Sequence, residues 1–91
     1  MATKYSAEVT IVNPLGLHAR PAAKLAQLCQ QFHSKIELIQ DGKTADASSV
    51  LALLMLASSK GKLLEIVAEG EDACQALQAV VHLIASGFEE S

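Results

Sequence analysis

A histidine and an arginine two residues apart, with a proline directly after the arginine, are the residues best suited to chemistry: His18, Arg20 and Pro21. A neutral imidazole is a good nucleophile, and the planar guanidinium group of arginine matches the oxygens of phosphate. Proline in a first helical turn loses no intrahelical hydrogen bond, so we expect a helix to begin close to His18 or Ala19. The spacing therefore predicts an anion-binding corner, with phosphate as the favoured anion.

The start of the expected helix would contribute to this corner. Its first N–H groups have no partner inside the helix, and the helix dipole places partial positive charge there. We therefore expect the backbone of Ala19 and Arg20 to face the histidine ring. A single histidine at a helix start can equally be a cap or an ordinary surface side chain, and the residues alone leave both interpretations open.

Composition narrows the function classes. The 91 residues are typical of one domain, spanning residues 1–91, and their formal net charge is −3. The acidic balance and the presence of only three aromatic residues argue against nucleic-acid binding. The longest uncharged apolar run, 50–57, is far shorter than the roughly 20 residues of a membrane span. We therefore expect a cytoplasmic protein that binds neither nucleic acid nor membrane.

The other reactive side chains do not suggest a second site. Cys29 and Cys74 fall within helix-like stretches, so we expect small buried residues rather than a disulfide or a redox pair. His33 and His82 have no partner at metal-ligand spacing and are expected at the surface or its boundary. The sequence thus predicts no metal and no cofactor.

Hydrophobic periodicity predicts the element order β-α-β-β-α-β-α. The expected strands cover 5–11, 35–40, 43–46 and 63–69, and the expected helices cover 19–31, 50–56 and 73–86. In the first strand, alternation should turn Tyr5, Ala7, Val9 and Ile11 toward the core. The turn and cap signals are Asp41-Gly42 for a tight hairpin, Ser49 and Asp72 for helix N-caps, Gly87 for a C-cap, and Phe88 for an apolar anchor in the acidic tail.

Three helices on one face of a four-stranded sheet bury these elements compactly. Because the first connection passes through a helix, strands one and two can be parallel with a gap between them, which strand four fills antiparallel to both. The predicted fold class is therefore α+β, an open-faced β-sandwich with strand order 1-4-2-3.

The run from Val50 to Leu56 is more apolar than a short surface helix requires. A helix that packs through one stripe needs only about three or four apolar residues per two turns. We expect part of the run to stay exposed and to dock a partner protein. This apolar patch consists of Val50, Leu51, Leu54 and Met55. Leu17, next to His18, is assigned to the same docking surface.

The segment from Gly16 to Ala22, Gly-Leu-His-Ala-Arg-Pro-Ala, resembles the HPr family, the histidine-containing phosphocarriers of the bacterial phosphoenolpyruvate-dependent phosphotransferase system. The resemblance covers nearly the whole chain, continuing through 41–43, 49–56, 60–61 and 68–70. The segments 49–56 and 86–90 resemble the nitrogen-related branch, NPr, more than the sugar-transport branch.

This resemblance implies a role for each residue of the corner. His18 would carry the phosphoryl group, on its pros nitrogen, while Arg20 and the helix start at Ala19 would stabilise the phosphoryl oxygens. The implied route runs from phosphoenolpyruvate through enzyme I, or its nitrogen-branch paralogue, to this protein and then to an EIIA-type domain. The protein would be a monomeric carrier in a relay and not an enzyme.

Ser49 has a second implied role besides capping. It matches the serine that a dedicated kinase, HPr kinase/phosphorylase, modifies in some members of the family, so regulatory phosphorylation is an expectation from the resemblance alone.

Two other functions compete with the carrier. A small phosphatase would need a paired acid or a second base to activate water, and none accompanies His18 and Arg20. A non-catalytic regulatory module would bind its partner through the apolar helix after Ser49 and would leave His18 without a role.

Overall fold

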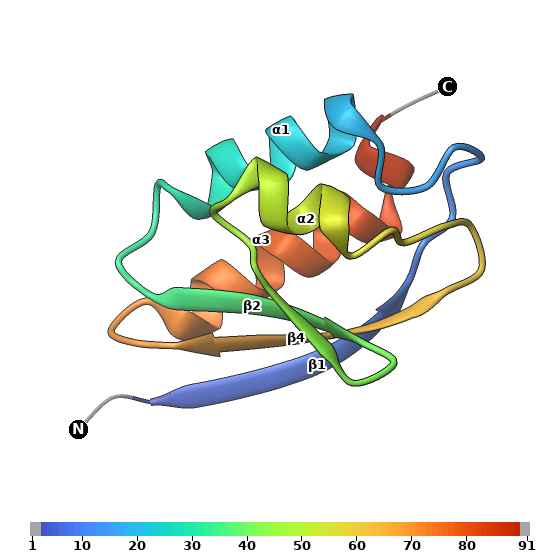
Figure 1. Ribbon diagram of the computed structural model, residues 1–91. Coiled ribbons are helices and arrows are strands. Elements are labelled where there is room, and N and C mark those ends of the chain that lie inside the picture. The colour runs from blue at the N-terminus through green and yellow to red at the C-terminus, as the bar shows by residue number, and fades with distance from the viewer. Residues whose placement is uncertain (1–2, 90–91) are drawn as a thin grey trace.

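The computed structural model describes residues 3–89 and has the predicted order of elements. The strands are β1 (Lys4–Thr10), β2 (Lys35–Gln40), β3 (Lys43–Asp46) and β4 (Leu63–Glu69). The helices are α1 (Ala19–Cys29), α2 (Val50–Met55), α3 (Ala73–Ala85) and a short 3-10 turn, η1 (Gly87–Glu89). Figure 1 shows that these helices all lie on one face of the sheet. None of the helices in this part of the chain is long and apolar enough to cross a membrane.

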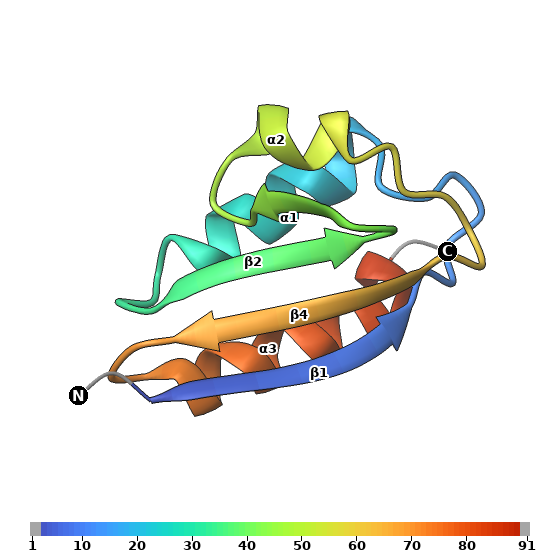
Figure 2. The same cartoon turned by 60° about the horizontal axis from the view of Figure 1, so that its bottom comes forward.

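The sheet has the order β1-β4-β2-β3, and every neighbouring pair is antiparallel. As predicted, β4 lies between β1 and β2, and Ile66 at its centre is paired with Ala7 on one side and Leu38 on the other (Figure 2). The side chains of Leu64, Ile66 and Ala68 all face the helices and are fully buried. The predicted open-faced β-sandwich is therefore confirmed.

The first strand is less buried than its alternation predicts. Val9 and Ile11 are buried, but Ala7 is half-buried and Tyr5 is 42% exposed, so Tyr5 lies on the predicted face, paired with the buried Ala68, without being part of the core. The strand also ends at Thr10, one residue early. The reason is topological, because β1 is an edge strand with a neighbour on one side only. Alternation reports which face a side chain is on, not how completely that face is covered.

The hairpin between β2 and β3 forms as its two turn residues predict. Asp41 and Gly42 both have positive φ, +51° and +80°, which is the geometry of a type I′ turn. The short return strand β3 is the other edge of the sheet.

The two cysteines have different environments. Cys29 is buried at the end of α1, two residues earlier than the expected helix end, and burial raises the pKa of its thiol to about 12, with the charge of Asp46 acting in the same direction. Cys74 is exposed, which corrects the expectation of two buried thiols. Its neighbour Ala73 begins the buried stripe of α3, so Cys74 lies about 100° away around the helix and outside that stripe.

His33 and His82 are exposed, as predicted.

Asp72 occupies the predicted N-cap position of α3, but its side chain does not cap the helix. Its carboxylate instead accepts hydrogen bonds from the backbone N–H groups of His33, at 2.9 Å, and Ser34, at 3.0 Å, and from the Ser34 hydroxyl. The Ser34 hydroxyl and these N–H groups hold the pKa of the Asp72 carboxyl below its usual value. Asp72 therefore fastens the loop between α1 and β2 to the start of α3.

The chain end is anchored where the sequence predicts. Gly87, with φ +70°, directly follows the C-cap residue Ser86 of α3, and the side chain of Phe88 is fully buried. The Phe88 carbonyl accepts a hydrogen bond of 2.9 Å from Lys24 Nζ, which links this end of the chain to α1. The rest of the acidic tail, residues 90–91, lies outside the described residues.

Candidate phosphate-binding site

His18 is the residue immediately before α1. Its backbone is extended, with φ −84° and ψ −170°, and its carbonyl accepts the first intrahelical hydrogen bond, 3.0 Å from the Ala22 N–H. The side chain is half-buried and does not cap the helix. His18 thus has the N-cap position without performing the usual N-cap function of its side chain, which removes capping as the explanation for a histidine here.

The first turn of α1 has the features of an anion site. The amides of Ala19 and Arg20 precede the first intrahelical hydrogen bond, so they lie at the positive end of an 11-residue helix. The guanidinium-bearing Arg20 is exposed in this turn, and Pro21 after it is buried against the core. His18, the helix start and the permanent cation of Arg20 thus occupy consecutive positions at one end of α1.

A tight turn leads into the histidine. The Gly16 N–H donates to the Asn13 carbonyl at 3.1 Å, and the Asn13 side-chain amide donates to the Gly16 carbonyl at 2.7 Å. Asn13 is buried, and Gly16 has φ +66°. Asn13 is not among the predicted site residues, so its contribution to the loop before His18 was missed. The spacing Asn-Pro-x-Gly, with proline second and glycine fourth, is the turn signature that could have revealed it.

Leu17 is a core residue, and its assignment to the docking surface was wrong. It is only 4% exposed, and its N–H donates to the Ser58 carbonyl at 2.9 Å. Successive side chains of an extended segment point to opposite sides. Because His18 is extended and reaches the surface, the side chain before it turns inward.

The apolar patch on α2 is exposed as predicted. Leu51 and Met55 are 69% and 72% exposed, and Val50 and Leu54 are 37% and 38% exposed. The inward side of the same run consists of Leu53 and Leu56, which are buried. Figures 1 and 2 both place the end of α2 beside the start of α1, so the patch and His18 belong to the same region of the helical layer.

Ser49 is the N-cap of α2. Its hydroxyl accepts a hydrogen bond of 3.2 Å from the Ala52 N–H, which confirms the predicted structural role. The side chain is half-buried at the end of α2 that carries Val50.

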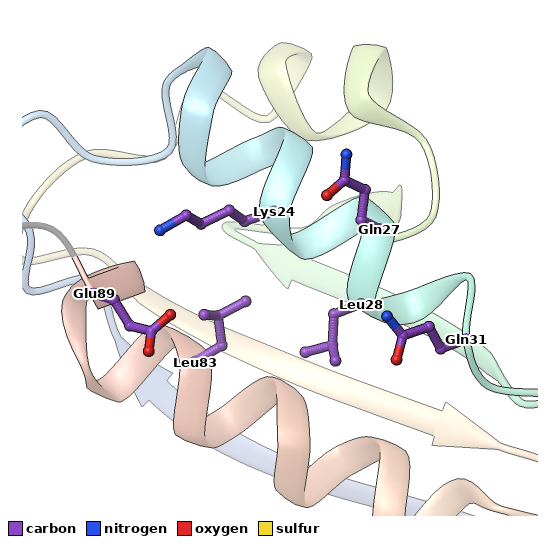
Figure 3. Close-up of a pocket in the computed structure, with 6 residues that line it drawn as sticks. All are labelled: Lys24, Gln27, Leu28, Gln31, Leu83 and Glu89. Carbon is purple, nitrogen blue, oxygen red and sulfur yellow. The ribbon is translucent and has the colours of Figure 1, made fainter.

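A separate hollow lies between α1 and α3 and has a volume of about 270 Å³. Figure 3 shows Leu28 and Leu83 facing each other across it, with Lys24 and Glu89 toward one end. It is lined by Lys24, Gln27, Leu28, Gln31, Leu83 and Glu89, so it contains no residue of the predicted site. Across residues 3–89, no cluster of three or more histidine, cysteine or carboxylate side chains could hold a metal ion. The anion corner itself lies at the surface, since Ala19 and Arg20 are exposed and His18 is half-buried.

The open-faced β-sandwich, with a histidine at the start of α1 and an exposed apolar helix beside it, defines the class of small histidine phosphocarriers. A family model described as the PTS HPr component phosphorylation site matches residues 5–86, and the chain belongs to this HPr family of phosphotransferase-system phosphocarriers.

Relatives and solved structures agree with this membership. The phosphocarrier protein NPr of Escherichia coli K12 is 48% identical over 91 residues, covering 99% of each chain, and that of Shewanella violacea is 46% identical over 89 residues, covering 98% of each. The crystal structure of an HPr from Thermoanaerobacter tengcongensis has a TM-score of 0.91 at 38% identity and covers 96% of this chain and 98% of its own. The predicted family and its NPr branch are confirmed.

Proposed function

We propose that this protein carries a phosphoryl group on His18, accepts it from enzyme I or its nitrogen-branch paralogue, and passes it to an EIIA-type domain. The observation that carries the proposal is the position of His18. Its ring lies at the start of an 11-residue helix without capping it, and Arg20 is in the first turn of that helix. We further propose that residues 1–91 act as a single monomeric carrier domain in the cytoplasm.

The chemistry of the step follows from the imidazole. The lone pair of Nδ1, the pros nitrogen, attacks phosphorus while the ring proton stays on Nε2, and the bond from phosphorus to the donor group breaks as the new N–P bond forms. Transfer to the acceptor is the same step with His18 as the leaving group. A neutral ring is therefore the reactive form in the first transfer, and a phosphorylated ring is the cargo-bearing form.

The start of α1 would stabilise the negative charge of the phosphoryl group during transfer. Charge on a transferring phosphoryl group is spread over its three outer oxygens, so donors aimed at those oxygens lower the barrier. Here the donors would be the amides of Ala19 and Arg20 and the Arg20 guanidinium. Because the site lies at the surface, water can reach it. A partner docked on the apolar patch would exclude that water, as the walls of an enclosed enzyme pocket do.

The proposed function can be tested by reconstituting the phosphoryl relay from purified proteins. Labelled phosphoenolpyruvate and enzyme I are expected to label this protein, and an added EIIA-type domain should remove the label. Rapid release of inorganic phosphate by the labelled protein alone would favour the small phosphatase. If no phosphotransferase partner labels the protein, the interaction module would be the better account.

Replacing Leu51 with aspartate is expected to weaken docking to enzyme I. Truncation of a residue at the packed centre of an interface can cost about 2 kcal/mol, and a charge there must also be desolvated, so the apparent KM for enzyme I should rise roughly tenfold or more. Because Leu51 is exposed, thermal stability should be retained.

Leu63→Asp is the matched control for this prediction. Leu63 is also an exposed leucine, 53% exposed, but it begins β4 on the face of the sheet away from the helices. The Leu63→Asp substitution should leave the apparent KM for enzyme I unchanged. Equal effects of the two substitutions, or unfolding caused by Leu51→Asp, would refute the docking role.

Ser49→Asp is expected to preserve the fold and slow phosphorylation of His18. Aspartate is a good N-cap and its charge suits a helix start, so stability should stay near that of the wild type. The added charge would be desolvated beside Val50 and Leu51 when a partner docks. An HPr kinase/phosphorylase that modified Ser49 would act in the same direction.

Ser49→Ala separates capping from charge. It should lower the free energy of unfolding by about 0.5–2 kcal/mol and leave the rate of His18 phosphorylation unchanged. Unfolding curves and labelling kinetics of the two variants provide the test. Ser49→Asp protein that is labelled at the wild-type rate would leave Ser49 with its capping role only.

A further inference from the structure

The loop that ends in His18 rests directly on the backbone of the loop between α2 and β4. The Leu17 N–H donates to the Ser58 carbonyl at 2.9 Å. At Gly16, a Cβ atom would lie 2.5 Å from the Ser58 carbonyl oxygen and 2.7 Å from the Ser59 Cα atom. Glycine is therefore needed at position 16 for two reasons, its φ of +66° and the close approach of a second backbone.

The supporting loop is itself held in place. Ser58 is only 5% exposed, and Leu56 before it is buried, with a carbonyl that accepts a hydrogen bond of 3.1 Å from Gln40 Nε2. Between them Ala57 adopts φ +55°, a conformation that a residue with a Cβ atom keeps only where its surroundings impose it. The Ala57 N–H donates back to the Leu54 carbonyl at 3.1 Å, so the loop is attached to the last turn of α2.

The path from the apolar patch to the histidine is consequently short. Leu54 belongs to the patch and accepts the hydrogen bond of Ala57, and Ser58, the next residue, accepts the hydrogen bond of Leu17. Leu17 directly precedes His18. The path thus consists of two backbone hydrogen bonds and the covalent bonds between neighbouring residues.

We propose that Gly16 and the Ser58 carbonyl are positioning elements for phosphoryl transfer. They fix the loop before His18 against the end of α2, so a partner seated on the apolar patch meets the imidazole in one defined placement. The proposal rests on the proposed function and adds to it a residue, Gly16, whose role is to place the nucleophile rather than to touch the phosphoryl group.

Gly16→Ala is the variant that tests this role, and Gly61→Ala is its matched control. Both put alanine at a positive φ, +66° and +91°, and both lie in the loops at this end of the molecule. A Cβ atom at Gly61 would meet nothing within 4 Å, whereas one at Gly16 would force the two loops apart. Both variants therefore experience backbone strain, but only Gly16→Ala should displace the His18 loop.

Two measurements read out the displacement. Hydrogen exchange of the Leu17 amide should accelerate in Gly16→Ala and remain slow in Gly61→Ala. The kcat of labelling by enzyme I should fall roughly tenfold to 100-fold in Gly16→Ala with little change in apparent KM, because misplacing a reacting group by about 1 Å can cost about 100-fold. Gly61→Ala should match the wild type in both kinetic constants.

Gln40→Met is a second variant, in case Gly16→Ala does not fold. It removes the hydrogen bond from Gln40 Nε2 to the Leu56 carbonyl and so loosens the supporting loop without a clash. It should also accelerate exchange at Leu17 and lower kcat at constant KM. Wild-type exchange and wild-type kcat in the folded variants would overturn the positioning role. A wild-type protein that enzyme I fails to label would instead overturn the proposed function, and the positioning role with it.

Discussion

Replacing His18 with alanine is expected to abolish labelling from phosphoenolpyruvate through enzyme I while the protein stays folded. The substitution removes the nucleophile but keeps the backbone carbonyl that accepts the first hydrogen bond of α1. The ring is half-buried and does not cap the helix, so its loss should change the free energy of unfolding by far less than loss of a core residue would.

His33→Ala and His82→Ala are the controls for this prediction. Both residues are exposed histidines outside the anion corner, one in the loop after α1 and the other in the last turn of α3. Each variant should be labelled at the wild-type rate. Undiminished labelling of folded His18→Ala protein would refute the assignment of the phosphoryl group to His18.

Replacing Arg20 with alanine is expected to lower kcat by about 100-fold to 1,000-fold, the usual effect of removing one donor that stabilises charge in a transition state. The apparent KM for enzyme I should change much less, since the guanidinium is proposed to act on the moving phosphoryl group. The kcat of Arg20→Lys should lie between those of the wild type and of Arg20→Ala, because lysine keeps the charge but loses the paired donors. An unchanged kcat with a raised KM would make Arg20 a docking residue only.

Stability provides an independent check on Arg20. A cation in the first turn of a helix opposes the helix dipole and costs about 0.3–1 kcal/mol. The exposed Arg20 should therefore be slightly unfavourable for folding, so Arg20→Ala should unfold at an equal or higher temperature while it transfers phosphate more slowly. Opposite signs for stability and activity would show that the arginine serves the site rather than the fold.

Much of the architecture follows from local sequence signals. The hairpin needed two residues at positive φ and Asp41-Gly42 provides them, and the cap of α2 needed a short hydroxyl side chain and Ser49 provides it. The strand order followed from a crossover through a helix, which leaves a gap that only the last strand can fill. These features depend on neighbouring residues or on connection lengths, both of which a sequence shows directly.

Three of the errors arose where a distant segment decides the outcome. Leu17 was assigned to the surface because it adjoins His18, but its position is set by a hydrogen bond to Ser58, 41 residues further along the chain. The carboxylate of Asp72 could have capped its own helix but accepts hydrogen bonds from His33 and Ser34 instead. Tyr5 has the right periodicity for the core, yet it lies on an edge strand. Periodicity and cap rules carry no information about such contacts.

The residues of the proposed site were easier to predict than the contacts that support them. His18, Arg20 and the helix start at Ala19 lie together because they are consecutive, and a sequence motif can specify them. The contact of Gly16 with the Ser58–Ser59 backbone joins two loops that meet only in the folded chain. A glycine in a motif signals that something approaches closely, but not which segment does so.

The central claim is that the phosphoryl group is bound to one nitrogen of one histidine, and NMR can test this directly. Protein with isotope-labelled histidine is treated with phosphoenolpyruvate and enzyme I, and the coupling between phosphorus and each imidazole nitrogen is measured. The chain has three histidines, and we predict coupling to Nδ1 of His18 and to no nitrogen of His33 or His82. Phosphorus coupled to either of the other two histidines, or to none of the three, would contradict the account.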